Sequence, residues 1–384
     1  MNRRDFIKIA GLSLIAPQLL AQKTDPTINS KTLVLLELKG GNDGLNTVVP
    51  YSDEKYYKLR PQLAVRREQV LQLSPELGLN PVMEKFMPIW QEKELAVICG
   101  VGYPEPNRSH FRSIEIWETG SDSNDYLQDG WIARLFEESD PGKLLADGII
   151  LGNNEGGPLA GLNMRNIFMR NPKQFFQQAK KLKELQAKTN NNALKHLLKV
   201  QQDIHTAAQD LEKKVMENSM AGSQFPPSQI GKQLQIAANI ITSDTPVAVI
   251  KVSHGGFDTH SGQRAKHDRL LQQLSNALHS FRKTLIEKGK WNDTLVMTYS
   301  EFGRRAYENG SKGTDHGTAA PHFMMGGKVR GGIYGKQPEL TELKKGDLVY
   351  HVDYRSMYST VANKWWNVSN DFSKDYEMIN CIKS

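Results

Sequence analysis

The sequence predicts an α/β fold with a largely parallel central sheet and helices on both faces. Short apolar runs recur along the chain, helical patterns lie between them, and polar residues with neighbouring glycines follow several of the runs. The runs are continuous rather than alternating, which is typical of strands covered on both faces. The succession of strand, helix and strand favours parallel pairing.

Five apolar runs are the predicted strands. They are Thr32–Leu38, Leu95–Gly100, Pro246–Val252, Thr294–Tyr299 and His322–Met325. Between two of them, Gln263–Lys288 carries apolar residues at three- and four-residue spacing and ends at Gly289. That pattern predicts an amphipathic helix. No internal repeat is found.

Residues 172–219 differ in composition from the rest of the chain. They are rich in Gln and Lys, have a helical pattern and are interrupted at Asn190-Asn191-Asn192. We interpret them as a helical insertion that either covers the sheet edge or offers a surface to a protein partner. A solvated helical hairpin is the alternative. The rest of the chain, from residue 22 to 384, is expected to form a single domain around it.

The first 21 residues resemble a signal peptide. A charged start is followed by a moderately apolar stretch that is too short to span a membrane. Arg3-Arg4 and the nearby Phe6 resemble a twin-arginine export signal, with cleavage expected after Ala21 although Leu19 is unfavourable there. The alternative is an ordinary amphipathic first helix. An export signal predicts a periplasmic or secreted protein, exported in the folded state.

Composition narrows the classes of function. The 384 residues are 39% hydrophobic and 24% charged, which is ordinary for a globular protein with a large core. The formal net charge is +7, and no Lys/Arg block with interleaved aromatic residues indicates nucleic-acid binding. Weak attraction to anionic substrates is compatible with this charge. Only Cys99 and Cys381 are present, so one disulfide is possible, and no further apolar run is long enough to cross a membrane.

Carboxylates and imidazoles follow the predicted strands or precede the last one. The carboxyl ends of parallel strands meet at one edge of a sheet, where sites form in such folds. Converging carboxylates and imidazoles are ligands for Zn²⁺ and for harder divalent cations. We therefore predict a site for a divalent ion such as zinc, manganese, calcium or magnesium. The candidate ligands are Asp43, Asp258, His260, Glu301, Asp315 and His316.

Two of these groups have simple structural alternatives. Asp43 lies in an Asn-Asp-Gly sequence, which is ordinary turn chemistry. Asp258 and His260 alternate, so they share a face if the segment is extended. The same segment is also placed to cap the helix that is predicted to begin at Gln263.

The remaining candidates follow the fourth predicted strand. Glu301 could pair with Arg304 or Arg305 instead of a metal. Asp315-His316 is followed by glycine and could form a surface turn. It is nevertheless the sharpest pair of ligand types in the sequence, because the two residues are adjacent on a glycine-rich loop.

A second stretch, Gly102–Gly120, contains candidates for catalysis. Ser109 could act as a nucleophile beside a metal ion, and Arg108 or Arg112 could hold a phosphate or sulfate group. The alternative is that Asn107 or Ser109 caps a helix. The two interpretations are compatible, since a helix N-terminus is itself an anion site. No GxSxG, Walker loop or GxGxxG is present, which weighs against serine esterases, nucleotide triphosphatases and dinucleotide oxidoreductases.

Several segments together resemble a family of exported bacterial proteins known as domain of unknown function 1501. The similarity runs from about residue 32 to 365. The segments that carry it are LLELKGGNDGLNTVVPY, NRSHFRSIEIWETG, GGFDTHSGQ, TLVMTYSEFGRR and GSKGTDHGTAAPHFMMGGKVRGGIYG. This family is thought to be a distant branch of the alkaline phosphatase-like superfamily, which includes sulfatases and cofactor-independent phosphoglycerate mutases.

The resemblance implies roles for individual residues. Asp43 would match the first metal aspartate of the superfamily, and Ser109 the nucleophile. The segment that ends the nucleophile helix is offset by one residue, so His110 could take the nucleophile's position instead. Asp258 and His260 would match an aspartate and a histidine that bind one metal, although the superfamily spaces them more widely.

The resemblance also has departures. Glu301 stands where the superfamily has the Asp of an Asp-His-Gly motif, and Phe302 replaces the histidine, so one ligand is lost. His316 would be a ligand, and Asp315 is available to replace the missing one. The site could therefore hold one metal or two.

These observations predict an exported metal-dependent hydrolase or transferase that acts on a phosphate or sulfate ester. The partner would be an anionic ester substrate or an envelope polymer, with no nucleic acid. The competing hypothesis is a catalytically degenerate member that binds a glycan or a protein in the cell envelope. A third is a passenger of the twin-arginine pathway that assists an envelope redox or secretion system.

Overall fold

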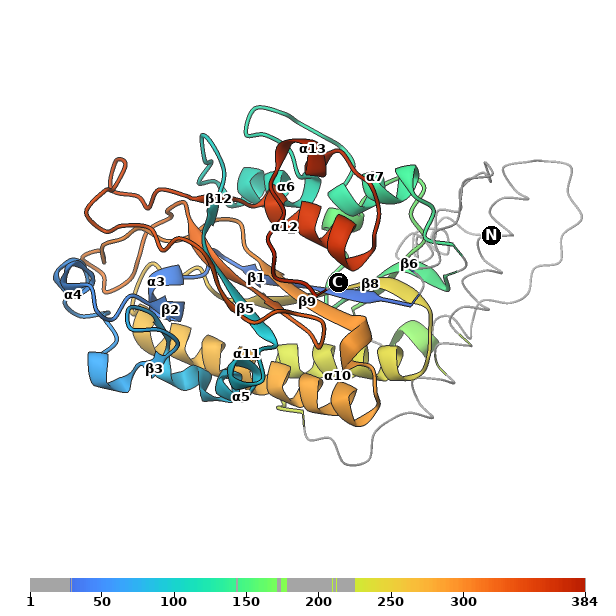
Figure 1. Ribbon diagram of the computed structural model, residues 1–384, viewed down its shortest axis with the longest axis horizontal. Coiled ribbons are helices and arrows are strands. Elements are labelled where there is room, and N and C mark those ends of the chain that lie inside the picture. Colours follow the sequence, from blue (N-terminus) through green and yellow to red (C-terminus); the bar gives the residue numbers. More distant parts are fainter. Residues whose placement is uncertain are drawn as a thin grey trace, which may run out of the picture.

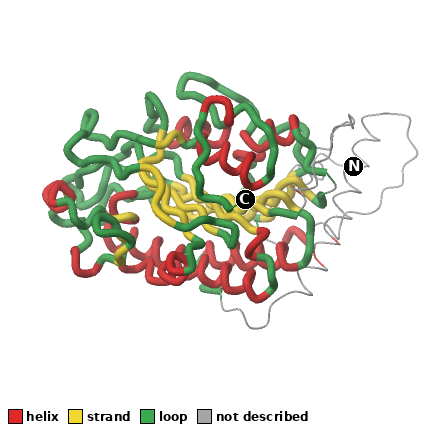
Figure 2. Tube along the Cα trace, in the orientation of Figure 1, coloured by secondary structure: helices red, strands yellow, loops and turns green. Residues whose placement is uncertain are grey.

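A computed structural model describes residues 28, 30–142, 144–170, 174–177, 209, 212 and 225–383. The expected signal peptide and nearly all of the expected insertion at 172–219 lie outside these residues. The described chain forms three layers, with a central sheet between two layers of helices (Figure 1 and Figure 2). Within the described ranges, no helix combines the length and the apolarity needed to cross a bilayer.

The main sheet has the strand order β11-β5-β10-β9-β1-β8-β6-β7, and β12 pairs with β5. Its strands are β1 (Thr32–Lys39), β5 (Leu95–Gly102), β6 (Ala146–Leu151), β7 (Asn166–Met169), β8 (Val247–Gly255), β9 (Thr294–Tyr299), β10 (Ala320–Met325), β11 (Gly332–Gly335) and β12 (Val352–Asp353). A small second sheet contains β2 (Val48–Val49), β3 (Leu71–Gln72) and β4 (Gly78–Leu79).

The predicted fold class and all five predicted strands are confirmed. The run at 294–299 has the predicted ends, and the other four strands extend by one to three residues at one or both ends or shift slightly. Strand β1 is parallel to both of its neighbours, β8 and β9. Strand β10 is antiparallel to both β5 and β9, so the sheet is mostly parallel with one reversed strand in its interior.

Both faces of the sheet are covered, which explains the continuous apolar runs. In β1, Leu33 and Leu35 pack into the core on one face, and Val34, Leu36 and Leu38 pack into the core on the other. Successive side chains of a strand point to opposite faces, so a strand buried on both sides needs an apolar residue at nearly every position.

Two groups of helices supply these two cores. The α-helices are α3 (Gly44–Thr47), α4 (Glu54–Leu59), α5 (Met87–Gln91), α6 (His110–Thr119), α7 (Trp131–Glu138), α10 (Gln229–Thr242), α11 (Gln263–Glu287), α12 (Arg355–Thr360) and α13 (Phe372–Asp375). Shorter or irregular turns are η1 (Arg67–Gln69), η2 (Pro81–Phe86), η3 (Gly157–Leu159), η4 (Trp291–Asp293) and η5 (Val361–Trp365). Helices α10 and α11 cover one face, and α6, α7 and α12 cover the other (Figure 1). The helix predicted at 263–288 is confirmed as α11.

The two cysteines do not form a disulfide. Cys99 and Cys381 are both free and buried, and they belong to the cores on opposite faces of the sheet. Burial raises the pKa of each thiol to about 12, so neither is a reactive thiolate at neutral pH.

Candidate metal centre

The strand directions bring several loops to one edge of the main sheet. Strands β1, β8 and β9 are parallel and end at this edge. Strand β5 ends there too, because β10 is antiparallel both to β5 and to β9. For the same reason the loop before β10 arrives at this edge. The topology thus gathers the segments after β1, β5, β8 and β9 with the segment before β10.

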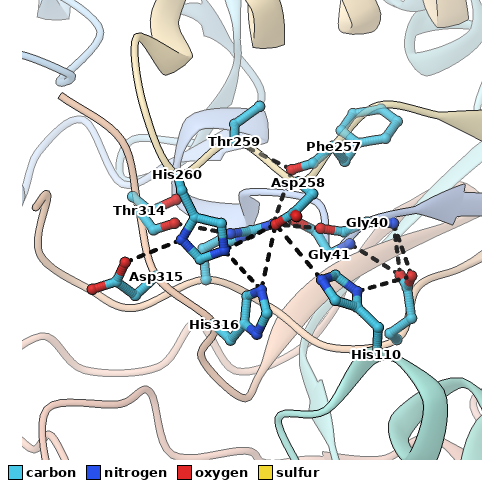
Figure 3. Close-up of polar contacts among 12 residues, drawn as sticks. Gly40, Gly41, His110, Phe257, Asp258, Thr259, His260, Thr314, Asp315 and His316 are labelled. Carbon is cyan, nitrogen blue, oxygen red and sulfur yellow. Dashed lines mark hydrogen bonds and ion pairs between the residues drawn. The ribbon is translucent and has the colours of Figure 1, made fainter. Parts of the chain in front are cut away.

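Three histidines turn the same ring nitrogen toward one carboxylate oxygen at this edge (Figure 3). The Nε2 atoms of His260, His316 and His110 lie 3.0, 3.3 and 3.6 Å from Oδ1 of Asp258. The Nε2 atoms of His260 and His316 are 2.9 Å apart. Each histidine comes from a different loop or helix, so the cluster is assembled by the tertiary fold.

The other ring nitrogen of each histidine has an oxygen partner. Nδ1 of His260 lies 3.1 Å from Oδ1 of Asp315, and Nδ1 of His110 lies 3.5 Å from Oε1 of Glu301. Nδ1 of His316 lies 2.9 Å from the backbone carbonyl oxygen of Arg108. A carbonyl oxygen can only accept, so a proton on Nδ1 of His316 satisfies this contact and turns the Nε2 atom toward His260 and Asp258. Histidines that bind metals are oriented in this way.

Arg304 holds the loops of this edge together. Its buried guanidinium donates to the backbone carbonyl oxygens of Gly40, Gly41, Phe257 and Thr314, and Nη2 lies 2.8 Å from Oδ1 of Asp258. Burial alone would raise the pKa of Asp258, but the bond and charge of Arg304 outweigh it and lower that pKa to about 2. The carboxylate is therefore ionised at neutral pH.

Glu301 lies behind His110 rather than among the converging Nε2 atoms. The residue is buried, and its carboxylate accepts bonds of 2.9 and 3.0 Å from the backbone N–H groups of Gly40 and Gly41. Burial would raise the pKa of Glu301, but hydrogen bonds from His110 and from these amides lower it. The bond to Glu301 in turn raises the pKa of His110. Glu301 thus contacts Nδ1 of His110 and lies away from the point where the three Nε2 atoms converge.

The turn after β1 needs glycine for this arrangement. Gly40 and Gly41 have φ angles of +113° and +76°, which residues with a Cβ rarely adopt. A Cβ on Gly40 would lie 2.5 Å from the backbone nitrogen of Asp258, and one on Gly41 would meet the ring of Phe302. The ring of Phe302 is itself a wall of the cluster, with its centroid 4.4 Å from that of His316 and 4.9 Å from that of His110.

Asp43 is not brought into the cluster. It is fully buried, lies 2.6 Å from Nη1 of Arg60 and accepts a hydrogen bond from Gln263. Burial would raise its pKa, but the charge of Arg60 outweighs burial and lowers it. The carboxylate predicted from the Asn-Asp-Gly segment to bind metal is therefore neutralised by a buried arginine.

The predicted catalytic residues have different surroundings. Ser109 is the exposed residue that precedes α6, and its side chain does not cap the helix. Arg112 donates to the backbone oxygens of Ser123 and Asp125, pairs with Glu115 at 3.0 Å and stacks on Tyr126. These contacts hold the side chain of Arg112 against α6 and the loop that follows it. His110, expected as a catalytic residue, is instead brought to the candidate ligands.

The donor set fits a divalent metal ion. His110, Asp258 and His316 each offer one ligand atom within 4.8 Å of the others, which makes them a possible metal site. The Nε2 of His260 lies directly beside it. Imidazole nitrogens with one carboxylate are typical Zn²⁺ ligands. The partners on Nδ1 supply the surrounding hydrogen bonds that such ligands need.

The fold and this cluster define an α/β protein with a candidate metal centre at the carboxyl edge of its sheet. The model of the family described as "Protein of unknown function (DUF1501)" matches residues 90–374. The chain therefore belongs to this family, and the predicted membership is confirmed. No curated protein sequence matches the chain.

Three solved structures are among those to which this chain is similar. The structure of Ps i-CgsB in complex with k-i-k-neocarrahexaose has 11% identity and a TM-score of 0.45, with 91% of this chain and 75% of that chain covered. A protein in the alkaline phosphatase superfamily from Vibrio parahaemolyticus has 11% identity and a TM-score of 0.41, with coverages of 95% and 75%. The lipoteichoic acid synthase LtaP from Listeria monocytogenes has 11% identity and a TM-score of 0.36, with coverages of 91% and 80%.

Proposed function

We propose that this protein is an exported metal-dependent hydrolase or transferase that acts on a phosphate or sulfate ester. The observation that carries the proposal is the convergence of three Nε2 atoms on Oδ1 of Asp258. His110, His316 and Asp258 would hold the ion with His260, and Glu301 and Asp315 would orient two of the rings. A divalent ion held there would supply Lewis acidity toward an ester oxygen.

The N-terminus of α6 supports an anionic substrate. His110 is the first residue of this ten-residue helix, and no side chain caps its first turn. The free N–H groups and the helix dipole favour a negative group beside His110. Ser109, exposed at the same point, is the candidate nucleophile. Both candidate arginines have partners, since Arg112 donates to its own loop and Arg108 pairs with Asp347 through Nη2; Arg108 is the better placed to contact the ester, because its side chain is partly exposed.

Metal content and turnover test this proposal. We expect the mature protein, purified after native export, to contain at least one equivalent of a divalent metal by elemental mass spectrometry. Replacing His316 with alanine should remove most of it, because one converging nitrogen is lost. Aryl phosphate and aryl sulfate, offered with zinc, manganese, magnesium and calcium in turn, test the activity. Turnover lost in Ser109→Ala supports the serine as nucleophile.

The alternative is a member of the family that binds an envelope glycan or protein without catalysis. The neutralisation of Asp43 by Arg60 favours it, since that carboxylate is not free to hold a second ion. Metal bound in full by the wild type, with no turnover of any ester tested, would support this alternative. Absence of both metal and turnover would contradict the leading proposal.

Export by the twin-arginine pathway and a single domain that begins after residue 21 are part of the proposal. The paired arginines, Arg3 and Arg4, support the export route. Replacing both with lysine should leave the precursor in the cytoplasm, while Lys8→Arg should not affect export. Fractionation of cells followed by detection of the mature protein measures this. A protein partner that binds residues 172–219 is also part of the proposal, and deletion of this segment should abolish that binding.

A further inference from the structure

A basic groove includes a residue that follows the candidate metal centre closely along the chain. It has a volume of about 740 Å³ and is formed by α4, the segment that leads into η1, and the start of α11. Its lining residues are mostly charged or polar. The basic residues that line it are Lys58, Arg60, Arg66, Arg67 and Arg264.

Two of these arginines have guanidinium groups without a partner among the described residues. Within the part of the chain that the structure describes, the side chains of Arg66 and Arg264 make no hydrogen bond or ion pair, and both residues are exposed. Arg67 uses only Nε, which donates to the backbone oxygen of Tyr51, and its guanidinium lies over the ring of Tyr57. The carboxylate of Glu54, which also lines the groove, lies 3.8 Å from Nζ of Lys58 rather than beside these arginines. The groove thus offers guanidinium groups with free donors.

The floor of the groove is rigid. Arg60 is fully buried, lies 2.6 Å from Asp43 and donates to the backbone oxygen of Arg305. Glu308 accepts from the backbone nitrogens of Gln62 and Leu63 at 3.0 and 2.8 Å. The wall of the groove is therefore joined to the segment that leads on to His316.

The groove and the candidate metal centre are close along the chain. Arg264 follows His260 by four residues, so their Cα atoms are separated by at most about 14 Å. The loop between them is tied down, because the backbone nitrogens of Gly262 and Gln263 donate to the oxygens of Ser311 and Lys312. This separation is short enough to be spanned by a molecule a few units long.

We propose that this groove binds a second phosphate or sulfate group of the same substrate, and that the substrate is an anionic glycan with such esters on successive units. The inference rests on the proposed function. Guanidinium groups bind these oxyanions through paired hydrogen bonds. Glu54, Gln62 and Glu68, which also line the groove, can accept hydrogen bonds from sugar hydroxyl groups.

The aromatic content of the groove favours a glycan over a nucleic acid. Proteins that bind single strands stack bases on exposed aromatic rings. Tyr57 is the aromatic residue among those that line the groove, and Arg67 covers its ring. It also packs edge-on against Tyr56 at 5.1 Å between centroids. No free ring is offered to a base by the described residues of the groove.

A double variant with a matched control tests the groove. Arg66→Gln with Arg264→Gln removes the two unoccupied guanidinium groups, and Arg269→Gln removes an exposed arginine of α11 that does not line the groove. Binding of a sulfated hexasaccharide and of a phosphorylated one is measured by calorimetry at two salt concentrations. We expect the double variant to bind at least one of them ten-fold or more weakly, and Arg269→Gln to bind as the wild type does. The hexasaccharide whose binding is weakened shows whether the groove binds a sulfate or a phosphate ester.

The remaining outcomes separate this inference from the proposed function. Equal binding by the wild type and the double variant would overturn the groove proposal. Tighter binding of single-stranded DNA than of both glycans, lost in the double variant, would overturn the choice of a glycan. His316→Ala should keep binding through the groove while losing metal. If the wild type turns over no ester but glycan binding still requires Arg66 and Arg264, the groove is supported and the hydrolase proposal fails.

Discussion

Glu301 has both carboxylate oxygens turned toward the backbone of the turn after β1. Replacing it with alanine leaves the N–H groups of Gly40 and Gly41 buried without acceptors. Each such loss costs about 1–3 kcal/mol, so we expect Glu301→Ala to lower the free energy of unfolding by about 3 kcal/mol. Urea unfolding measures this. Glu92→Ala, at an exposed position, is the control and should change stability by less than about 0.5 kcal/mol.

Wild-type stability in Glu301→Ala would show that the carboxylate matters only to the candidate metal centre. A milder loss in Glu301→Gln is expected, because the amide keeps one acceptor oxygen. Loss of metal together with stability would fit its position behind His110, since that ring would lose the partner of its Nδ1.

The candidate site could be predicted from the sequence where ligand types stand together at a strand end. Asp258 with His260, and Asp315 with His316, are such pairs, and the structure brings them together. Asp43 has an equally suggestive position, but Arg60 neutralises it. The contact between Asp43 and Arg60 depends on how α4 packs, so no local sequence pattern predicts it. His110 could have been included with the ligands, because it follows a predicted strand that ends at the same edge.

The partners of Arg304 also could not be predicted from local sequence patterns. Its neighbour Glu301 suggested a simple ion pair, but the structure pairs Arg304 with Asp258 and with four backbone oxygens. Only the tertiary meeting of three loops creates that binding pocket for a guanidinium.

At the scale of single elements, the turn after β1 gives a test that separates backbone strain from steric contact. Gly41 has φ of +76°, and a Cβ there would meet the ring of Phe302. Gly289, after α11, has φ of +68° with no atom within 4 Å of such a Cβ. We expect Gly289→Ala to cost about 1 kcal/mol from strain alone. Gly41→Ala should cost about 2 kcal/mol more, because Phe302 must move.

Thermal or urea unfolding of the two variants measures this difference. Gly41→Ala should also weaken metal binding, since Phe302 packs on the rings of His110 and His316. Equal stability of the two variants would contradict the close approach of Gly41 to Phe302.

Strand β10 provides a prediction on pH. It buries His322, whose ring lies 5.0 Å from that of Trp117 in α6, and desolvation lowers its pKa from 6.5 to about 3. In the unfolded chain the ring gains a proton below about pH 6.5, while the folded protein keeps it neutral. The free energy of unfolding is therefore not reduced by His322 well above pH 6.5, and it falls as the pH drops from 6.5 toward 3. Between pH 7 and 5 the loss is about 2 kcal/mol.

The variant His322→Gln isolates this effect. Its free energy of unfolding should fall less between pH 7 and 5 than that of the wild type, by about 2 kcal/mol. Urea titrations at the two pH values provide the comparison. Parallel pH profiles for both proteins would show that His322 is not kept neutral by burial.

At the scale of the whole molecule, the sequence predicted the central strands because burial on both faces demands an apolar residue at nearly every position. It missed β6 and β7, whose sequences ADGIIL and NIFM are short and partly polar. The sequence also did not predict that β10 is antiparallel to its neighbours, since an apolar run has the same pattern in a parallel and in an antiparallel strand. That reversal decides the site, because it carries His316 to the edge where β1, β5, β8 and β9 end.

A metal ion at this edge would connect loops that are far apart in the sequence. His110, Asp258 and His316 lie on segments joined to β5, β8 and β10, so an ion that binds only their folded arrangement stabilises the whole domain. At one hundred times the dissociation constant the gain is about 2.7 kcal/mol. For a chain of this length that raises the melting temperature by about 4 °C.

Differential scanning fluorimetry of the metal-stripped protein, with and without zinc, measures this shift. His316→Ala should lose most of the shift, because it removes a converging nitrogen, while His351→Ala, at an exposed histidine of the described chain, should retain it. Equal shifts in the wild type and in His316→Ala would mean that zinc binds elsewhere. That result would contradict the candidate metal centre at the edge to which β10 carries His316.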